Sequence, residues 1–419
     1  MSVASKVKMI TNNKNKKCGL IGKKLGHSFS PLIHSNLANY SYSLFEMEES
    51  ELESFIRDVD FCGVNVTIPY KVEVTKYLDF ISPEAEKIGC VNTVIKRDGK
   101  TYGFNTDYFG LKYLIEKNGI EINGANVLIL GTGGSSLTAH AVCSHMSARS
   151  INFVSRSGDI NYENVYTLCP ETNVIINTSP AGMYPKNDEC HIVLDKFKNL
   201  SGVVDIIFNP SKTKLLMQAE ALGIKHANGL PMLVAQAKAA CEIFTDEKIS
   251  DSEIDRITKI IEDNTKNIVL VGMPGCGKSH IGRLIAEALG RELIDTDEEI
   301  IKDAGMPIPE IFAKYGEEVF RQYEHNVIVR VGKLSGKVIS TGGGVVTRDN
   351  NYAPLHQNSK IFFIERDISS LPTNGRPLSQ TNSLIEMYEK RLPLYNRFAD
   401  FKVKNDSTPE ECADKIINS

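Results

Sequence analysis

A glycine-rich string past the middle of the chain carries the strongest chemical signal. Residues 268–285 read IVLVGMPGCGKSHIGRLI, an apolar run that enters Gly272-Met-Pro-Gly-Cys-Gly-Lys278-Ser279 and leaves on a helical pattern. Strand, loop and helix match the phosphate-binding loop G-x-x-x-x-G-K-[ST]. In such a loop the backbone N–H groups and the helix N-terminus attract phosphate, the lysine reaches the outer phosphates, and the serine holds Mg²⁺. The string predicts a bound nucleoside triphosphate but does not identify the phosphate acceptor.

Charged residues downstream of this loop could hold the metal and the acceptor. Asp295 and Asp297 follow a short apolar run, and their spacing would let both point the same way from a strand end. Carboxylates there suit Mg²⁺ or a substrate hydroxyl. The alternative is a helix N-terminus, where carboxylates complement the helix dipole. Arg321 by itself is typical of an ion pair, and glycines 342–344 could form a turn or lie tight against a ligand.

A second glycine-rich string lies in the first half of the chain. Gly131-Thr-Gly-Gly-Ser-Ser136 follows an apolar run and precedes a helical pattern, which favours a dinucleotide site. An NAD site would carry Asp or Glu about 20 residues after the first glycine. That place holds Ser155-Arg156-Ser157, whose guanidinium and hydroxyls suit the 2′-phosphate of NADP. The alternative is that Arg156 is only a solvated residue at a strand end.

Three polar strings upstream could converge on a polyhydroxylated ligand. They occupy residues 26–35 (GHSFSPLIHS), 63–71 (GVNVTIPYK) and 89–110 (GCVNTV…GFNTDYFG). Turn chemistry would explain any one of them, but the three together favour a substrate pocket. Reduction of a ketone by hydride requires a proton at the oxygen. Lys71 could supply that proton, with Asp107 holding the ammonium group in place.

The elements that must position these residues follow an α/β pattern. Short apolar runs alternate with helical stretches, as expected for mostly parallel strands. The runs occupy residues 17–21, 63–68, 126–130, 150–154, 173–176 and 203–208. An amphipathic helix pattern around Ile254 to Ile261 precedes polar residues 263–266, which we predict to be a linker. The roughly 150 residues after them are enough for one small domain.

Composition limits the class of protein. The chain has 419 residues, of which 42% are hydrophobic and 24% charged, with a net charge of −4. This balance argues against a nucleic-acid partner, which needs a clustered basic surface. Nine cysteines without metal-site spacing favour reduced thiols in a cytoplasmic protein. Residues 1–16 lack the apolar core of a signal peptide and are expected to be a disordered tail, and no run approaches the ~20 apolar residues of a membrane span.

The strings of the first half resemble the motif series of shikimate dehydrogenase, in its usual order. GHSFSP, NVTIPYK, NTD, GTGGSS, NTSPAGM, DIIFNPSKTKLL and NGLPMLVAQA carry the resemblance over residues 17–262. It implies a substrate subdomain (17–115 and 230–262) and a Rossmann-like NADP-binding subdomain (116–229). The implied reaction is the NADPH-dependent reduction of 3-dehydroshikimate to shikimate. Phe208 departs from the family, which usually has tyrosine at this position.

The same resemblance implies a role for particular residues. Lys71 and Asp107 would be the catalytic pair and would also contact the substrate. The other substrate-binding residues would be Ser28, Ser30, Thr67, Asn92 and Gln236. The NADP site would be lined by Gly131, Gly133, Gly134, Arg156 and Gly229.

The strings of the second half resemble shikimate kinase over residues 267–419. GMPGCGKS, ELIDTDEEI, GEEVFRQYEHNVI, VISTGGGVV, GRPLSQ and YEKRLPLYNRFADF carry the resemblance. It implies a P-loop α/β domain with a central parallel sheet and a lid, which transfers a phosphoryl group from ATP to shikimate to give shikimate 3-phosphate. ATP would be bound by Gly275, Cys276, Gly277, Lys278, Ser279, His280 and Arg376. Mg²⁺ would be held by Ser279 and Asp295, and shikimate by Asp297, Arg321, Gly343 and Arg391.

Both resemblances together predict two consecutive reactions on small molecules, with no nucleic-acid or membrane partner. One alternative keeps the folds but makes the first enzyme an NAD-dependent quinate/shikimate dehydrogenase. Ser28, Ser30 and Arg156 favour shikimate and NADP instead. Another alternative is a regulator or scaffold built on degenerate enzyme modules, which the intact catalytic motifs of both halves oppose.

Overall fold

The computed structural model describes residues 17–26, 28–371 and 381–419. The chain divides into two compact units. The first unit comprises Met1–Met183, Asp188–Phe208 and Leu215–Ile260, and the second comprises Tyr184–Asn187, Asn209–Lys214 and Ile261–Ser419. The predicted tail at 1–16 and the lid residue Arg376 lie outside the described residues.

The first unit contains two sheets, and the first of these is mixed. Its strand order is β2-β1-β3-β5-β6-β4. The strands are β1 (Lys17–Gly22), β2 (Tyr42–Glu46), β3 (Phe61–Val66), β4 (Phe80–Ile81), β5 (Thr93–Arg97) and β6 (Lys100–Phe104). β1 runs parallel to both β2 and β3, whereas β5 is antiparallel to its two neighbours, β3 and β6. The pairing of β5 with β6 is antiparallel because a two-residue turn joins the two strands directly and so reverses the chain.

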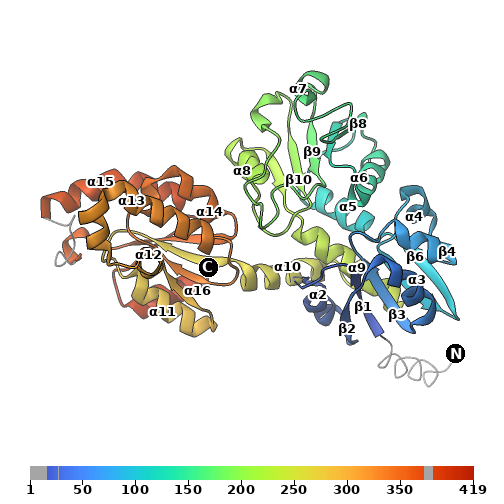
Figure 1. Cartoon of the computed structure of the whole chain (residues 1–419), viewed down its shortest axis with the longest axis horizontal. Helices are drawn as coiled ribbons and strands as arrows, with labels where there is room; N and C mark the ends of the chain where they lie inside the picture. Colours follow the sequence, from blue (N-terminus) through green and yellow to red (C-terminus); the bar gives the residue numbers. More distant parts are fainter. Residues whose placement is uncertain (1–16, 27, 372–380) are drawn as a thin grey trace. The chain divides into compact units, whose positions relative to one another are not determined.

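Helices cover both faces of this sheet. On one face lie α2 (Ser30–Leu37) and α9 (Leu230–Thr245), where Phe244 packs against Cys18 and Ile95. On the other face lies α3 (Glu49–Asp58), whose Leu52 and Ile56 are buried against the strands. Because α9 comes from much later in the chain than the strands, this sheet is completed by residues from both ends of the first unit (Figure 1).

The second sheet is parallel throughout, with the strand order β11-β10-β9-β7-β8. The strands are β7 (Asn126–Leu130), β8 (Ser150–Val154), β9 (Val174–Asn177), β10 (Gly202–Asp205) and β11 (Lys225–Ala227). Helices α5 (Asp107–Lys117) and α6 (Gly134–His145) pack on one face, and α7 (Val165–Leu168) and α8 (Lys214–Ala221) pack on the other. Helices on both faces of a parallel sheet are the arrangement of a doubly wound nucleotide-binding domain.

Most of the predicted linker at 263–266 is helical. Helix α10 (Ser252–Thr265) continues to Thr265, and β12 begins at Asn267. Its last turn is stabilised because Lys266 pairs with Glu262 four residues earlier, at 2.9 Å, and because a cation there complements the helix dipole. Polar residues therefore end a helix here. Among the helices that the structure describes, none is long and apolar enough to cross a membrane.

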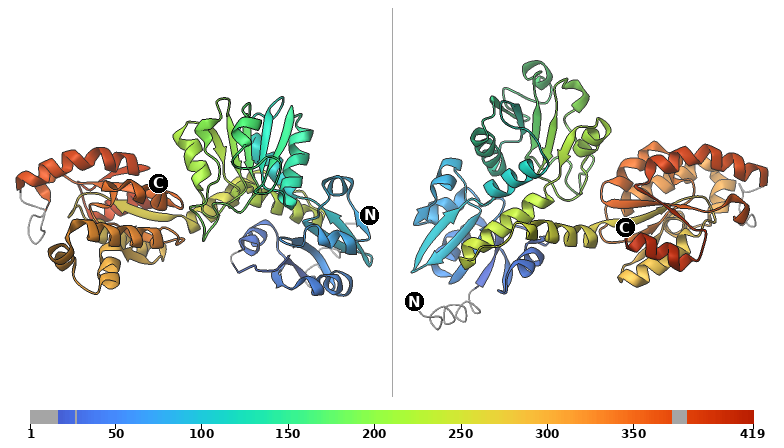
Figure 2. Two further views of the ribbon diagram at one scale, coloured as in Figure 1. Left: turned by 45° about the horizontal axis from the view of Figure 1, so that its top comes forward. Right: turned by 180° about the vertical axis from the view of Figure 1, so that it is seen from behind.

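The second unit is a five-stranded parallel sheet between two layers of helices (Figures 1 and 2). The strand order is β13-β14-β12-β15-β16, and the strands are β12 (Asn267–Val271), β13 (Leu293–Asp295), β14 (Val338–Ser340), β15 (Ser359–Glu365) and β16 (Phe401–Lys404). One layer contains α11 (Lys278–Leu289) and α16 (Pro409–Ile417). The other contains α12 (Thr296–Ala304), α13 (Ile308–Val331), α14 (Tyr352–His356) and α15 (Thr381–Phe398). The mostly parallel α/β organisation predicted from the sequence is confirmed in both units.

Candidate active sites

The loop between β12 and α11 is held as a phosphate cradle. Lys278 Nζ donates to the carbonyl oxygens of Gly272 and Met273, at 2.9 and 3.0 Å. Asn405 Nδ2 supports the loop by donating to the carbonyl oxygen of Cys276 at 2.8 Å. Because α11 begins at Lys278, the positive N-terminal end of the helix lies directly after the loop. The loop forms one wall of a cavity of about 480 Å³.

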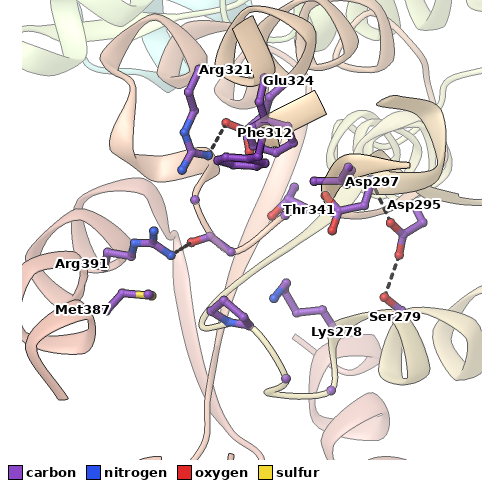
Figure 3. A pocket seen from close by; sticks show the side chains of 18 of the residues that line it. Lys278, Ser279, Asp295, Asp297, Phe312, Arg321, Glu324, Thr341, Met387 and Arg391 are labelled. Atoms are coloured by element: carbon purple, nitrogen blue, oxygen red, sulfur yellow. Dashed lines mark hydrogen bonds and ion pairs between the residues drawn. The ribbon is translucent and has the colours of Figure 1, made fainter. Parts of the chain in front are cut away.

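Asp295 fits the metal-binding role predicted for it. Its Oδ2 accepts a hydrogen bond from the Ser279 hydroxyl at 2.7 Å, so a carboxylate and a hydroxyl oxygen are brought together beside the loop (Figure 3). Oxygen ligands of this kind are the ones Mg²⁺ prefers. The other oxygen, Oδ1, accepts the backbone N–H of Asp297 at 3.0 Å and caps α12.

The prediction that Asp295 and Asp297 both leave a strand end is therefore half wrong. Asp295 ends β13, but Asp297 lies in the first turn of α12 because Asp295 caps that helix. The metal-site and helix-terminus interpretations both apply, since one carboxylate serves both purposes. Both aspartates nevertheless line the same cavity.

The opposite side of the cavity carries two arginines (Figure 3). Arg391 Nη1 donates to the carbonyl oxygen of Gly343 at 3.0 Å, and Tyr395 Oη donates to the same oxygen at 2.5 Å. Arg321 is buried and forms ion pairs with Glu324 at 2.9 Å and Glu317 at 3.0 Å. The ion-pair interpretation of Arg321 is thus correct, and Arg321 lines the cavity as well.

Glu324 is an additional titratable group in this cavity. Burial raises the pKa of its carboxyl group, and the nearby Asp297 raises it further, while Arg321 and Arg391 oppose the increase. Its Oε1 atom has no hydrogen-bond partner among the described residues. The sequence analysis did not single out Glu324, although its place three residues after Arg321 on a helix was the available signal.

This one cavity gathers nearly all the residues predicted for the kinase. They are Gly275, Gly277, Lys278, Ser279, His280, Asp295, Asp297, Arg321, Gly343 and Arg391. Cys276 is buried within the loop and does not line the cavity, and Arg376 lies outside the described residues. The apolar lining was not predicted, because residues such as Phe312, Phe320 and Met387 have the spacing of ordinary core positions.

In the first unit, Lys71 and Asp107 form a close ion pair. Lys71 Nζ donates to Asp107 Oδ2 at 2.5 Å, and both side chains are largely shielded from solvent. Lys71 Cβ lies 3.9 Å from the position that a side chain at Gly134 would occupy. Gly134 is the first residue of α6, so the glycine-rich turn lies beside the ion pair.

A chain of buried hydrogen bonds joins further residues of the predicted substrate site. Asn92 Nδ2 donates to Thr106 Oγ1 at 3.1 Å and to Gln236 Oε1 at 3.4 Å. Asn65 Nδ2 donates to the carbonyl oxygen of Asn92 at 3.4 Å. Tyr42 Oη in turn donates to Asn65 Oδ1 at 2.8 Å. The hydrogen-bond chain connects β2 and β3 to α9 through Asn92, which directly precedes β5, and it fixes the orientation of the Asn92 and Gln236 amides.

The two predicted serines belong to the same region. Ser28 Oγ lies 3.1 Å from Ser30 Oγ and accepts the backbone N–H of Ser30 at 3.2 Å. Burial raises the pKa of Tyr42 well above its ordinary value, while a hydrogen bond with Ser30 lowers it. Tyr42 thereby links Ser30 to the buried chain of hydrogen bonds. A buried asparagine within the apolar strand β3, Asn65, was a signal for this network that the sequence analysis did not use. Thr67 directly follows that strand, and its N–H donates to the carbonyl oxygen of Ile21 at 2.9 Å.

The predicted NADP residues lie at the carboxyl ends of β7 and β8. Gly131 to Gly134 follow β7 and lead into α6, and Arg156 follows the adjacent parallel strand β8, where it is exposed. Turns after adjacent parallel strands lie at the same edge of a sheet, which is where dinucleotides bind. Gly229 precedes α9, and a Cβ atom at this position would lie 1.9 Å from the carbonyl oxygen of Ile206. Only glycine allows the two backbone segments to approach so closely.

Comparisons with known proteins identify families for both halves of the chain. Residues 20–94 match the family model described as shikimate dehydrogenase substrate binding domain, and residues 274–419 match the model described as shikimate kinase. The shikimate dehydrogenase (NADP(+)) of Clostridium beijerinckii is 37% identical over 268 residues, which are 59% of this chain and 98% of that protein.

Solved structures agree for the dehydrogenase part of the chain. A chorismate mutase/shikimate 5-dehydrogenase fusion protein from Clostridium acetobutylicum is 37% identical, with a TM-score of 0.57. Shikimate dehydrogenase 1 from Peptoclostridium difficile is 35% identical, with a TM-score of 0.55. Each of the two matches covers 59% of this chain and 97% of the other. The relatives are covered almost completely at substantial identity, and the kinase match falls in the remaining part of the chain. The chain therefore belongs to the shikimate dehydrogenase family and carries a shikimate kinase domain in its C-terminal part.

Proposed function

We propose that the chain reduces 3-dehydroshikimate to shikimate with NADPH and then phosphorylates shikimate with ATP. The observation that carries the proposal is the presence of both reactive constellations in one chain. Lys71 and Asp107 form a close pair beside a dinucleotide-type turn, and a P-loop shares a cavity with Asp297 and two arginines. Since NADPH and ATP are diffusible cofactors of the cytoplasm, we place both reactions there.

The dehydrogenase reaction uses the buried ion pair for proton transfer. When bound, NADPH supplies the hydride. Lys71 then gives a proton to the substrate oxygen as that oxygen gains negative charge. Asp107 holds the ammonium group at 2.5 Å and keeps it directed at the substrate. The substrate's hydroxyls and carboxylate are bound by Ser28, Ser30, Thr67, Asn92 and Gln236.

The kinase reaction depends mainly on positioning and charge. When bound, ATP supplies the phosphoryl group. Lys278 and the loop N–H groups would position the outer phosphates, and Ser279 with Asp295 would hold Mg²⁺. Asp297 accepts a hydrogen bond from the attacking hydroxyl of shikimate and receives its proton. Arg321 and Arg391 bind the carboxylate of shikimate and so fix the direction from which its hydroxyl approaches.

A two-readout assay tests the proposal. Purified protein is given 3-dehydroshikimate and NADPH, and oxidation of the cofactor is followed by its absorbance. In a separate reaction the protein is given shikimate, Mg²⁺ and ATP, and release of ADP is measured. Both reactions should proceed. Failure of either, in protein whose folded state is confirmed by a cooperative unfolding transition, would contradict the corresponding half of the proposal.

A further inference from the structure

Every nitrogen of the Arg321 guanidinium donates a hydrogen bond to a carboxylate on the same helix. Nη1 donates to Glu324 Oε2 at 2.9 Å, and Nε and Nη2 donate to Glu317 Oε1 at 3.2 and 3.0 Å. All three residues lie on α13, and the spacings of three and four residues place them on one face of the helix. The edge formed by Nε and Nη2, which is a standard docking edge for a carboxylate, is held by Glu317.

The two glutamates differ sharply in burial. The Glu324 side chain is 1% exposed, whereas the Glu317 side chain is 57% exposed. Separating Arg321 from Glu324 would leave uncompensated charge in the interior, which is costly. An exposed ion pair, in contrast, contributes little and exchanges readily with solvent or other ions. Glu324 is therefore a fixed partner of Arg321, and Glu317 is an exchangeable one.

A break in the helix gives Glu317 its position. Gly316 has φ 82° and ψ 176°, a conformation that other residues rarely adopt, and it divides α13 into two stretches. Glu317 is the first residue of the second stretch, and its carboxylate also complements the N-terminal end of that stretch. The Glu317 side chain thus contacts Arg321, which lines the cavity, and is itself exposed to solvent.

We propose that Glu317 competes with the carboxylate of the kinase substrate for Arg321 and thereby sets the affinity for that substrate. This inference rests on the proposed role of Arg321 in binding shikimate. We assign a bidentate substrate carboxylate to the edge formed by Nε and Nη2, which Glu317 holds, so that the two carboxylates compete for the same donors. Binding of substrate thus requires that Glu317 turn towards solvent, while Glu324 stays paired with Nη1. Glu317 is a specificity-determining residue that favours ligands with a carboxylate strong enough to displace it.

Replacing Glu317 with glutamine tests the competition, because the amide is nearly the same size but carries no charge. We expect the KM for shikimate in Glu317→Gln to fall about two- to fivefold, the range that corresponds to an exposed ion pair of up to about 1 kcal/mol. The kcat should change less than twofold, because Lys278, Ser279, Asp295 and Asp297 are untouched. This split between KM and kcat separates competition from a general structural effect.

Glu318→Gln is the matched control. Glu318 is the next residue on the same helix, is 79% exposed, and pairs with Arg348 instead of Arg321. The Glu318→Gln variant loses the same charge from the same turn of the helix. Its KM for shikimate should equal that of the unmodified protein. The full chain is assayed by ADP release at nanomolar enzyme without NADP⁺, so that shikimate binding to the dehydrogenase does not deplete the substrate.

A neutral substrate analogue supplies the second readout. Shikimate methyl ester has no carboxylate to exchange with Glu317, so its KM should differ less than twofold between Glu317→Gln and the unmodified protein. An unchanged or increased KM for shikimate in Glu317→Gln would overturn the inference, and so would an equal decrease in Glu318→Gln. If the unmodified protein releases no ADP when shikimate is added, the proposed kinase function itself fails, which is a distinguishable outcome.

Discussion

Lys71 Nζ lies 2.5 Å from Asp107 Oδ2, across 36 residues of sequence. Lys71 follows the third strand of the first sheet, and Asp107 is the first residue of α5, the helix that leads into the second sheet. The ion pair therefore joins the segment after β3 to the start of α5, which follows β6 of the same sheet. It also places the proposed proton donor, Lys71, beside the turn proposed to bind NADP.

Replacing Lys71 with alanine removes that donor. We expect the dehydrogenase kcat to fall on the order of 10²-fold or more, the usual contribution of a general acid. Shikimate-dependent ADP release should be unchanged, because the kinase residues belong to the second unit. Lys76→Ala is the control, since Lys76 lies in the same segment but pairs with Glu73 on the surface. Equal dehydrogenase rates in the two variants would clear Lys71 of the role.

Arg156 is expected to set the cofactor preference. Arg156→Asp should remove attraction for the 2′-phosphate and favour the free 2′-hydroxyl of NAD, so the ratio of kcat/KM for NADP⁺ over NAD⁺ should fall at least tenfold. Arg149→Asp is the control, because Arg149 is exposed just before β8, at the opposite edge of the sheet. A ratio that stays the same in Arg156→Asp would support the interpretation of Arg156 as a solvated residue.

Asp295 is expected to bind Mg²⁺ in addition to capping helix α12. In Asp295→Asn the side chain can still cap the helix through its carbonyl oxygen, so stability should change little. The loss of negative charge should raise the Mg²⁺ concentration needed for half-maximal kinase activity by about tenfold. The measurement is a Mg²⁺ titration of ADP release at saturating ATP and shikimate. An unchanged midpoint would show that Asp295 is only a helix cap.

His34 is expected to make the first unit sensitive to acid. Burial lowers the pKa of His34 from 6.5 to about 3, although a hydrogen bond with Asn65 opposes this decrease. The ring is stacked on Tyr42, with centroids 4.0 Å apart, and Nδ1 lies 2.6 Å from Tyr40 Oη. Between pH 6.5 and 3 the unfolded chain therefore binds a proton that the folded chain excludes.

The stability associated with neutral His34 is fully present above pH 6.5 and is lost as the pH falls towards 3. The loss should be about 1.4 kcal/mol for each pH unit within that window. Urea unfolding at pH 7 and pH 5 measures it, and His34→Gln should show a correspondingly smaller difference between the two pH values. The same difference in both proteins would mean that His34 does not control this pH dependence.

Much of the fold could be predicted because phosphate binding restricts sequence so strongly. The apolar runs at 126–130 and 150–154 coincide with β7 and β8, and the run before the P-loop is β12. The hairpin of β5 and β6 was not predicted, although its Asp98-Gly99 turn is a strong hairpin signal. Polar residues at the ends of these strands, such as Asn92 and Thr93, interrupt the apolar pattern that would indicate a strand. These polar residues are buried only because the folded chain supplies hydrogen bonds to them.

At the candidate sites, too, prediction from the sequence failed where a contact depends on the folded chain. Lys71, Asp107, Lys278 and Ser279 could be named because their chemistry requires particular residue types. The hydrogen bond from Tyr42 to Asn65 could not be predicted, because it depends on how β2 and β3 pack within the sheet. For Asp297 the sequence left a strand end and a helix N-terminus open, and the residue lies in the first turn of α12, which Asp295 caps.

The two reactions are expected to occur in a fixed order, because both act on the same oxygen atom of the substrate. The family resemblance implies that the dehydrogenase reduces the C3 ketone of 3-dehydroshikimate and that the kinase phosphorylates the C3 hydroxyl of shikimate. A ketone has no O–H to attack the phosphoryl group, and Asp297 would face a carbonyl oxygen that cannot donate to it, which is a costly mismatch. With 3-dehydroshikimate, Mg²⁺ and ATP, acceptor-dependent ADP should therefore appear only after NADPH is added.

Two variants divide the sequence of reactions at defined points. Lys278→Ala should stop it at free shikimate, because the loop loses the cation that reaches the outer phosphates. Lys71→Ala should stop it at 3-dehydroshikimate but still phosphorylate added shikimate, because the kinase cavity keeps all its residues. Products are separated by chromatography and identified by mass. Reduction by NADPH is what converts the C3 ketone into a hydroxyl. Phosphorylated product formed from 3-dehydroshikimate without NADPH would therefore contradict the assignment of the C3 hydroxyl as acceptor.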